Sequence, residues 1–196
     1  MTEQASTGRS GGSGTGVRDD ARAGGGTMLR ALAADGPDPG YGDALGLYGW
    51  LIGSWEIDNR YFDEADGAWH AAKGLWHFGW ILRGRGIQDV LTGLSSAGAG
   101  GGAGTTVRVY DPNIDAWRVS WFGAFSGEYC TLVGRPDADG AGIFQEGAGV
   151  DGRPLRWVFD DIQPDSFHWE GFVSDDGGDT WRLEQEMHAR RVTVEG

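Results

Sequence analysis

Few side chains of this sequence fall where they could bind or polarise a small molecule. Arg108 and Tyr110 lie on one face of a segment that alternates apolar and polar residues. Arg83, Arg85 and Asp89 share a face of the segment before it. An inward guanidinium can hold a ligand carboxylate or polarise a carbonyl, so Arg85 and Arg108 are candidate ligand-binding residues. If both face outward, they are solvated or form cross-strand ion pairs.

The four histidines do not form a metal-binding pattern. His70 and His77 are seven residues apart on one expected strand and hence on opposite faces, while His168 and His188 fall on expected outer faces. We therefore expect no metal site. His77 is the only histidine on a face that could point inward, so a haem held by one histidine would have to use it.

Signatures of catalytic centres are also missing. The sequence has no Gly-x-Ser-x-Gly elbow and no His-Glu-x-x-His motif. Glu170, Glu184 and Glu186 fall on the expected solvent face, which favours ion-paired surface residues over acid–base pairs. The catalytic residues therefore stay unassigned. If the chain is an enzyme, we expect cyclisation or isomerisation of a bound hydrophobic molecule, with Tyr61 or His77 as the proton donor.

From Ser54 onward, apolar and polar residues alternate, which is typical of β-strands. We therefore expect β-strands to position these side chains. One strand is expected from Ser54 to about Phe62, and nine more near residues 68–81, 84–92, 104–111, 116–122, 127–135, 141–149, 154–161, 166–174 and 180–192. The short turns leave little room for crossover helices. We predict an all-β fold, an antiparallel up-and-down β-barrel of about ten strands with a short N-terminal helix. A two-sheet sandwich is the alternative, but closure removes exposed edges.

One short motif, Asp-x5-Trp, occurs at Asp63–Trp69, Asp111–Trp117 and Asp175–Trp181. Each copy lies between two alternating segments, which predicts a hairpin turn followed by a tryptophan that anchors the next strand. The third copy, within SDDGGDTW, resembles the Asp-box of sialidase-like propellers. The body of the chain could supply roughly three blades, whereas a propeller needs at least four. We therefore interpret the motif as scaffold.

The chain divides into three parts. Residues 1–26 are rich in Gly, Ser and Thr and predict a disordered tail. Residues 27–42 predict a short helix, capped by Thr27, and a linker. Residues 43–193 form the barrel domain, which opens with a second helix from Asp43 to Ile52, capped by Asp43. The Gly-rich segment Leu94–Gly104 is a linker and not a phosphate-binding loop, because no Gly-Lys-Ser/Thr follows it.

Composition excludes several classes of partner. A net charge of -13 argues against a nucleic-acid partner, which needs a basic surface. No apolar run approaches the roughly 20 residues of a membrane span, and the N-terminus has no secretory h-region. Cys130 is the single cysteine, which excludes an internal disulfide. We expect a cytoplasmic protein with no membrane or nucleic-acid partner, and exposed Phe62 or Phe122 could support a homodimer.

The segment Leu51–Trp55, LIGSW, resembles the Gly-x-Trp signature of the calycin superfamily, the lipocalins and fatty-acid-binding proteins. In that family the Trp closes one end of the barrel and a basic residue of the last strand packs over it. Counting by two from Trp181 puts Arg191 in that place, over Trp55. Residues 43–193 also resemble bacterial lipocalin-like domains of unknown function, through phrases similar to GTTVRVYDP, AWRVSW and SDDGGDTW. The resemblance implies a barrel that binds a small molecule.

Ten tryptophans either fill the barrel or line a cavity, and a barrel of ten strands leaves space for a ligand. Period two places Leu183, Gln185 and Met187 of the last strand inward. The candidate ligand-binding residues are Asn59, Tyr61, His77, Arg85, Arg108, Trp121, Trp157, Trp169 and Gln185. We expect a binding protein for a small hydrophobic or aromatic molecule, with no cofactor. The alternatives are a cofactor-free cyclase or isomerase in the same pocket and a solid barrel that acts as an interaction module.

Overall fold

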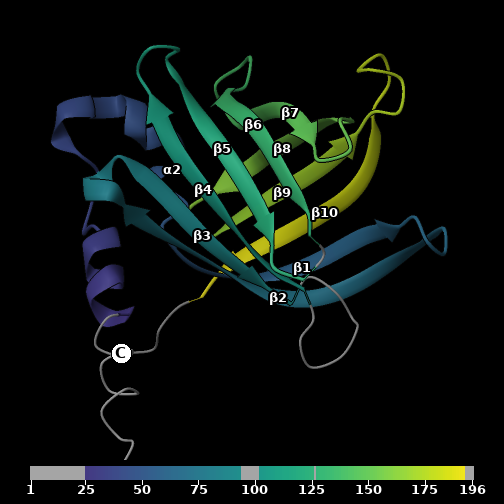
Figure 1. Ribbon diagram of the computed structural model, residues 1–196, viewed down its shortest axis with the longest axis horizontal. Coiled ribbons are helices and arrows are strands. Elements are labelled where there is room, and N and C mark those ends of the chain that lie inside the picture. The colour runs from purple at the N-terminus through teal and green to yellow at the C-terminus, as the bar shows by residue number, and fades with distance from the viewer. Residues whose placement is uncertain (1–24, 94–101, 126, 193–196) are drawn as a thin grey trace, which may run out of the picture. The chain divides into compact units, whose positions relative to one another are not determined.

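Ten antiparallel strands close into a barrel in the computed structural model, which describes residues 25–93, 102–125 and 127–192 (Figure 1). Each strand pairs with its neighbours in sequence, and β1 pairs with β10 to close the ring. This confirms the predicted up-and-down barrel and excludes both the propeller and the sandwich. The strands are β1 (Gly53–Asp63), β2 (Ala68–Ile81), β3 (Gly86–Thr92), β4 (Ala103–Asp111), β5 (Ala116–Gly123), β6 (Tyr129–Pro136), β7 (Ile143–Gly149), β8 (Pro154–Gln163), β9 (Ser166–Val173) and β10 (Arg182–Arg191).

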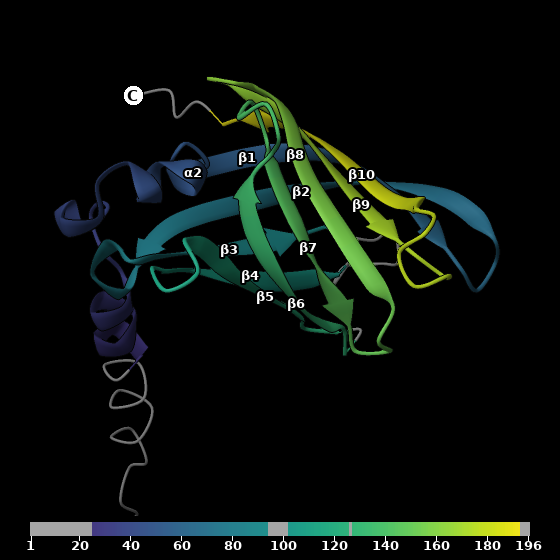
Figure 2. The ribbon, with the colours of Figure 1, turned by 90° about the horizontal axis from the view of Figure 1, so that it is seen from above.

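The alternation of apolar and polar residues sets which face of each strand points inward. In β1, Trp55, Ile57 and Asn59 are buried, whereas Glu56 and Arg60 are exposed and Asp58 is half-buried. Successive side chains of a strand point to opposite faces, so a period of two puts one set into the interior. Figures 1 and 2 show the β1–β2 hairpin reaching beyond the neighbouring strands, at the end of the barrel opposite α2.

A helical segment closes the other end of the barrel. It consists of a 3-10 helix, η1 (Pro39–Leu45), followed directly by the single turn α2 (Gly46–Gly49). Leu45, Tyr48 and Leu51 are buried in the core, so this segment forms the floor of the interior. The expected helix cap at Asp43 is wrong: the helix begins earlier, and the carboxylate of Asp38 accepts a hydrogen bond from the Gly40 N–H at 2.9 Å.

Trp55 and Arg191 close this end as the calycin resemblance predicts. The Arg191 guanidinium lies 4.0 Å from the centroid of the Trp55 ring, and the ring nitrogen donates to the Leu51 carbonyl at 2.8 Å. Arg191 also donates to the carbonyls of Trp50, Ile52 and Pro164. A β-carbon on Gly53, which has φ 129°, would lie 2.8 Å from the Arg191 Nη1 atom. The Gly of Gly-x-Trp is therefore favoured by a backbone conformation that other residues rarely adopt, and the close approach of Arg191 adds to that preference.

A β-bulge interrupts the alternation of β10. Its register against β9 shifts between Leu183 and Gln185, which leaves Glu184 as the extra residue. Arg182 lies opposite the buried Val173, so even-numbered residues of β10 face inward before the bulge. After the bulge, odd-numbered residues of β10 face inward. The expectation that Leu183 points inward and Glu184 toward solvent is wrong for this reason.

The helix nearest the N-terminus spans residues 25–32 and begins two residues before the expected cap at Thr27. Most of the expected tail, residues 1–24, lies outside the described residues, as do residues 94–101 of the Gly-rich linker. No helix in the described part of the chain is long and apolar enough to cross a membrane.

Candidate functional site

The barrel encloses a cavity of about 890 Å³, so its interior is not packed solid. Four tryptophans from four strands line it, namely Trp76, Trp121, Trp157 and Trp169. Trp169 meets Trp76 and Trp157 edge to face, at ring-centroid distances of 6.4 and 5.5 Å, which makes a continuous aromatic wall. A volume of this size and an aromatic lining are typical of small-molecule sites.

A buried ion pair lies on the wall of this cavity. Arg108 of β4 and Asp89 of β3 are both fully buried, and the Arg108 Nη1 atom donates to Asp89 Oδ2. The second oxygen of Asp89 accepts from the Thr106 backbone N–H at 2.9 Å. The guanidinium also lies 5.4 Å from the Tyr48 ring centroid. Arg108 therefore faces inward, and Asp89 balances its charge away from bulk solvent.

Two residues that line the cavity each carry a hydrogen-bond donor without a partner. The Trp76 Nε1 and Arg108 Nε atoms are buried, and no acceptor for either lies within the described residues. An unmade hydrogen bond on a buried donor costs about 1–3 kcal/mol, and native structures keep such groups rare. Both atoms are covered by neighbouring side chains, so an acceptor oxygen of a bound molecule would reach them only after a local side-chain movement.

The cavity wall also carries an acid and a thiol. Glu184, which the bulge turns inward, lines the cavity together with Glu128 and Cys130. Burial raises the pKa of Glu184, against the opposing charges of Arg153 and Arg182. Burial, together with Glu128 and Glu184, raises the pKa of the Cys130 thiol to about 12. Cys130 is therefore a neutral lining residue and not an activated nucleophile.

The Glu184→Gln variant is expected to be more stable than the wild type at pH 7.5, with the difference vanishing toward pH 4. The raised pKa of Glu184 means that the folded state disfavours the carboxylate, so stability falls as pH rises past the unfolded pKa of about 4.3. Below it the carboxyl is neutral in both states. Urea unfolding at the two pH values measures the difference. The exposed Glu56→Gln variant serves as the control, and a less stable Glu184→Gln protein at pH 7.5 would contradict the prediction.

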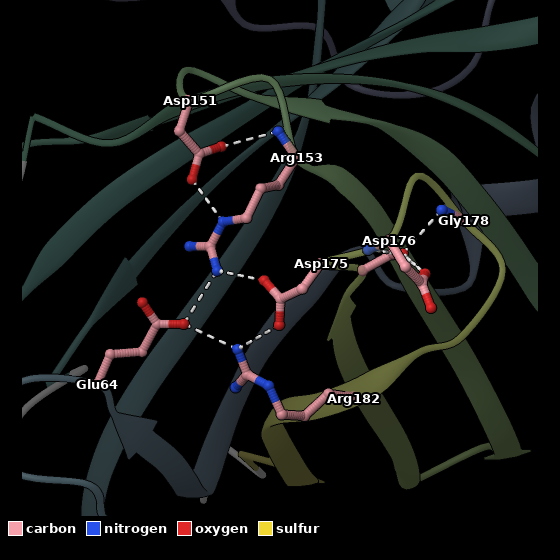
Figure 3. Close-up of polar contacts among 8 residues, drawn as sticks. Glu64, Asp151, Arg153, Asp175, Asp176, Gly178 and Arg182 are labelled. Atoms are coloured by element: carbon pink, nitrogen blue, oxygen red, sulfur yellow. Dashed lines mark hydrogen bonds and ion pairs between the residues drawn. The ribbon is translucent and has the colours of Figure 1, made fainter.

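Ion pairs tie three turns together at the mouth of the cavity (Figure 3). Glu64, from the β1–β2 turn, accepts from Arg153 at 3.0 Å and from Arg182 at 2.8 Å. Asp175, from the β9–β10 turn, contacts the same two arginines at 3.2 and 3.5 Å. Asp151 binds Arg153 within the β7–β8 turn at 2.6 Å. Single exposed pairs contribute little, but this network fixes the relative positions of three turns.

The Asp-box sequence forms the β9–β10 turn that carries Asp175. Ser174 Oγ accepts from the Gly178 N–H at 2.8 Å and donates to Asp176 Oδ1 at 2.7 Å (Figure 3). Asp176 Oδ1 accepts from the Thr180 N–H at 2.9 Å, and hydrogen bonds from Thr180 hold the pKa of Asp176 well below its usual range. The motif is a turn within a barrel, as expected for scaffold.

The structure gathers most of the predicted site residues in one place. Those that line the cavity are Tyr61, Arg108, Trp121, Trp157, Trp169 and Gln185. Asn59 is buried beside them, and its Oδ1 atom accepts from Gln185 Nε2 at 2.9 Å. A role of any of these residues in ligand binding stays a prediction.

Two predicted residues lie elsewhere. His77 is exposed on the outer face of β2, where Nδ1 lies 2.8 Å from Ser54 Oγ, so neither ligand contact nor haem ligation inside the barrel is open to it. Arg85 follows the 3-10 turn η2 (Leu82–Gly84) at the closed end, with its guanidinium 4.1 Å from the Tyr41 ring centroid. The turn interrupts the period of two, which is why counting along the sequence misplaced Arg85.

Trp76, Cys130 and Glu184 are among the cavity residues that sequence reasoning missed. The signal for Trp76 was present in the sequence. Trp76, Phe78 and Trp80 share one face of β2, and this face is far more apolar than the face that carries His77, which favours it as the inward one. Nothing in the sequence marks the bulge at Glu184, because bulges arise from strand pairing.

Comparisons with known proteins support the fold alone. No family model and no curated protein matches the chain. Among solved structures, the barrel is similar to the S-type phycobiliprotein lyase CPES from Guillardia theta, with a TM-score of 0.53 and 10% sequence identity. The similarity covers 76% of this chain and 93% of the lyase. At this level of identity the chain shares the lyase's architecture, and its site must be interpreted from its own residues.

Proposed function

We propose that this chain is a calycin-like protein that binds a small, flat and largely apolar molecule inside its barrel. The observation that carries the proposal is the cavity of about 890 Å³, with its four tryptophans and its two unpartnered N–H groups. Flat aromatic walls favour a flat guest, and apolar burial supplies most of the affinity. The two donors, on Trp76 and Arg108, would then fix the orientation of the ligand.

The polar group of the ligand is more consistent with a carbonyl than with a carboxylate. Asp89 already balances the charge of Arg108, so a ligand carboxylate would bring an uncompensated negative charge into a buried site. A carbonyl oxygen would accept from the Arg108 Nε or Trp76 Nε1 atom without that cost, once a side-chain movement uncovers the donor. The structural neighbour is named for its action on phycobiliproteins, and the shared barrel supports the interior as the binding region.

Native mass spectrometry of the protein purified from its own host is the most direct test, because a retained small molecule would name the ligand class. Tryptophan fluorescence quenching with a panel of flat carbonyl compounds then measures affinity. We expect Trp76→Phe, which removes one donor and keeps an aromatic ring, to weaken binding about tenfold.

The matched control is Trp69→Phe, because Trp69 belongs to the same strand and is exposed outside the cavity. Its affinity should equal that of the wild type. Two results would contradict the proposal: no quenching by any compound of the panel, or equal losses in the two variants.

An isomerase or cyclase is the second candidate, and Glu184 favours it. A carboxyl with a raised pKa that lines a shaped apolar pocket can move a proton on a bound molecule. Tyr61 also lines the cavity, whereas His77 does not. Turnover of the retained molecule that Glu184→Gln abolishes, with its affinity kept, would favour this candidate. A cytoplasmic location and a homodimer stay predictions from the sequence.

A further inference from the structure

Two histidines and three carboxylates gather on the outer face of β8, β9 and β10, outside the cavity. Strand pairing places Asp160 opposite His168, His168 opposite His188, and Glu170 opposite Glu186. Side chains at directly opposite positions of an antiparallel pair have β-carbons about 5 Å apart. The expectation that the histidines do not cluster is therefore wrong for His168 and His188, which come together only through the register of β9 and β10.

The geometry of this group suits a metal ion. The imidazole rings of His168 and His188 are stacked, with centroids 4.4 Å apart and planes at 17°. One nitrogen of each ring and one carboxylate oxygen of Glu186 lie within 4.8 Å of one another. Two imidazoles and a carboxylate supply three of the four ligands of a tetrahedral zinc site. Because the two rings are stacked with nearly parallel planes, one ring must turn so that both nitrogen lone pairs point at the same ion.

Asp160 orients His168 in the way that metal-binding histidines are oriented. The Nδ1 atom of His168 lies 3.0 Å from Asp160 Oδ1, so this carboxylate holds the proton on Nδ1 and leaves the lone pair on Nε2. That Nε2 atom is buried, and none of the described residues offers it a hydrogen-bond partner. The third proposed ligand, Glu186, accepts from Arg60 through its Oε1 atom, which leaves Oε2 as a ligand atom.

A cation would also act on the two carboxylates of this group, of which Glu186 already pairs with Arg60. Glu170 and Glu186 occupy directly opposite positions, where two negative charges repel each other. A divalent ion between the strands would reverse this repulsion and would join β9 to β10.

We propose that His168, His188 and Glu186 bind one divalent transition-metal ion of the zinc type on the outer wall of the barrel. Asp160 is a positioning residue that acts through His168. Trp169 and Met187 are adjacent in sequence to the two histidines and line the cavity on the inner face of the same strands. An ion bound on the outer face would therefore make this part of the cavity wall more rigid. The site does not depend on the proposed ligand.

Isothermal titration of the full-length, tag-free chain with ZnCl2 tests the proposal. We expect one ion per chain, and His168→Ala and His188→Ala should each weaken binding at least a hundredfold. Asp160→Asn should weaken it ten- to a hundredfold without changing the stoichiometry or the Co²⁺ absorption spectrum. His77→Ala is the matched control, because His77 also lies exposed on an outer face and should leave binding unchanged.

Nuclear magnetic resonance of the wild-type histidine rings gives a second test that needs no variant. The chain has four histidines, and ZnCl2 should shift the ring signals of two of them. No heat and no shift would overturn the proposal. Binding that His70→Ala abolishes would also overturn it, because His70 forms a separate group with Asp63 and Asp66 near the mouth.

Discussion

Replacing Asp89 by alanine is expected to lower the free energy of unfolding by about 3–5 kcal/mol, measured by urea denaturation. The substitution leaves the Arg108 guanidinium buried on the cavity wall without its counterion and removes the acceptor of the Thr106 N–H. An uncompensated buried charge costs far more than the lost contact itself.

Two variants separate this cause from a general loss of packing. Asp89→Ala combined with Arg108→Met removes both charges and should be more stable than Asp89→Ala alone. Asp58→Ala is the surface control, because Asp58 forms exposed ion pairs with Lys73 and Arg190 whose loss costs at most about 1 kcal/mol. If the double variant is the less stable of the two, the ion pair contributes net stability and the argument fails.

Arg191→Ala should destabilise the protein by about 2–4 kcal/mol, because it removes the cover over Trp55. The same change removes the charged donor from the carbonyls of Trp50, Ile52 and Pro164, which lie in two separate segments at the closed end.

The adjacent residue provides the matched control. Arg190 is an exposed arginine of the same strand that pairs with Asp58, so Arg190→Ala should cost less than about 1 kcal/mol. Urea unfolding of the two variants under identical conditions checks the difference. Equal losses would mean that the contact with Trp55 does not stabilise the barrel end.

The fold could be predicted from the sequence because its signals are local. The β2 strand was expected at residues 68–81 and spans Ala68–Ile81, since its alternation and flanking turns are complete within the segment. The closed end followed from Gly53 and Trp55, and Arg191 is found where the calycin resemblance places it. The strand needed only a period and a turn, whereas the closed end needed the calycin resemblance as well.

The candidate site depends on pairing between strands, which a single sequence does not display. Glu184 enters the cavity because of a bulge, and Asp89 meets Arg108 because β3 and β4 pair with a particular register. The His168 and His188 pair arises in the same way across β9 and β10. A shift of one residue would send each of these side chains to the other face.

The side-chain hydrogen bonds of Ser174, Asp176 and Thr180 lie within the Ser174–Trp181 turn. Two further contacts join the turn to its surroundings: the Ser174 N–H donates to the Pro154 carbonyl at 3.0 Å, and Asp175 pairs with Arg153. The internal hydrogen bonds therefore shape the corner, and the outward contacts fit it to this barrel. A match to this motif therefore indicates how the chain turns, whereas the architecture around the turn is determined by the order of the strands.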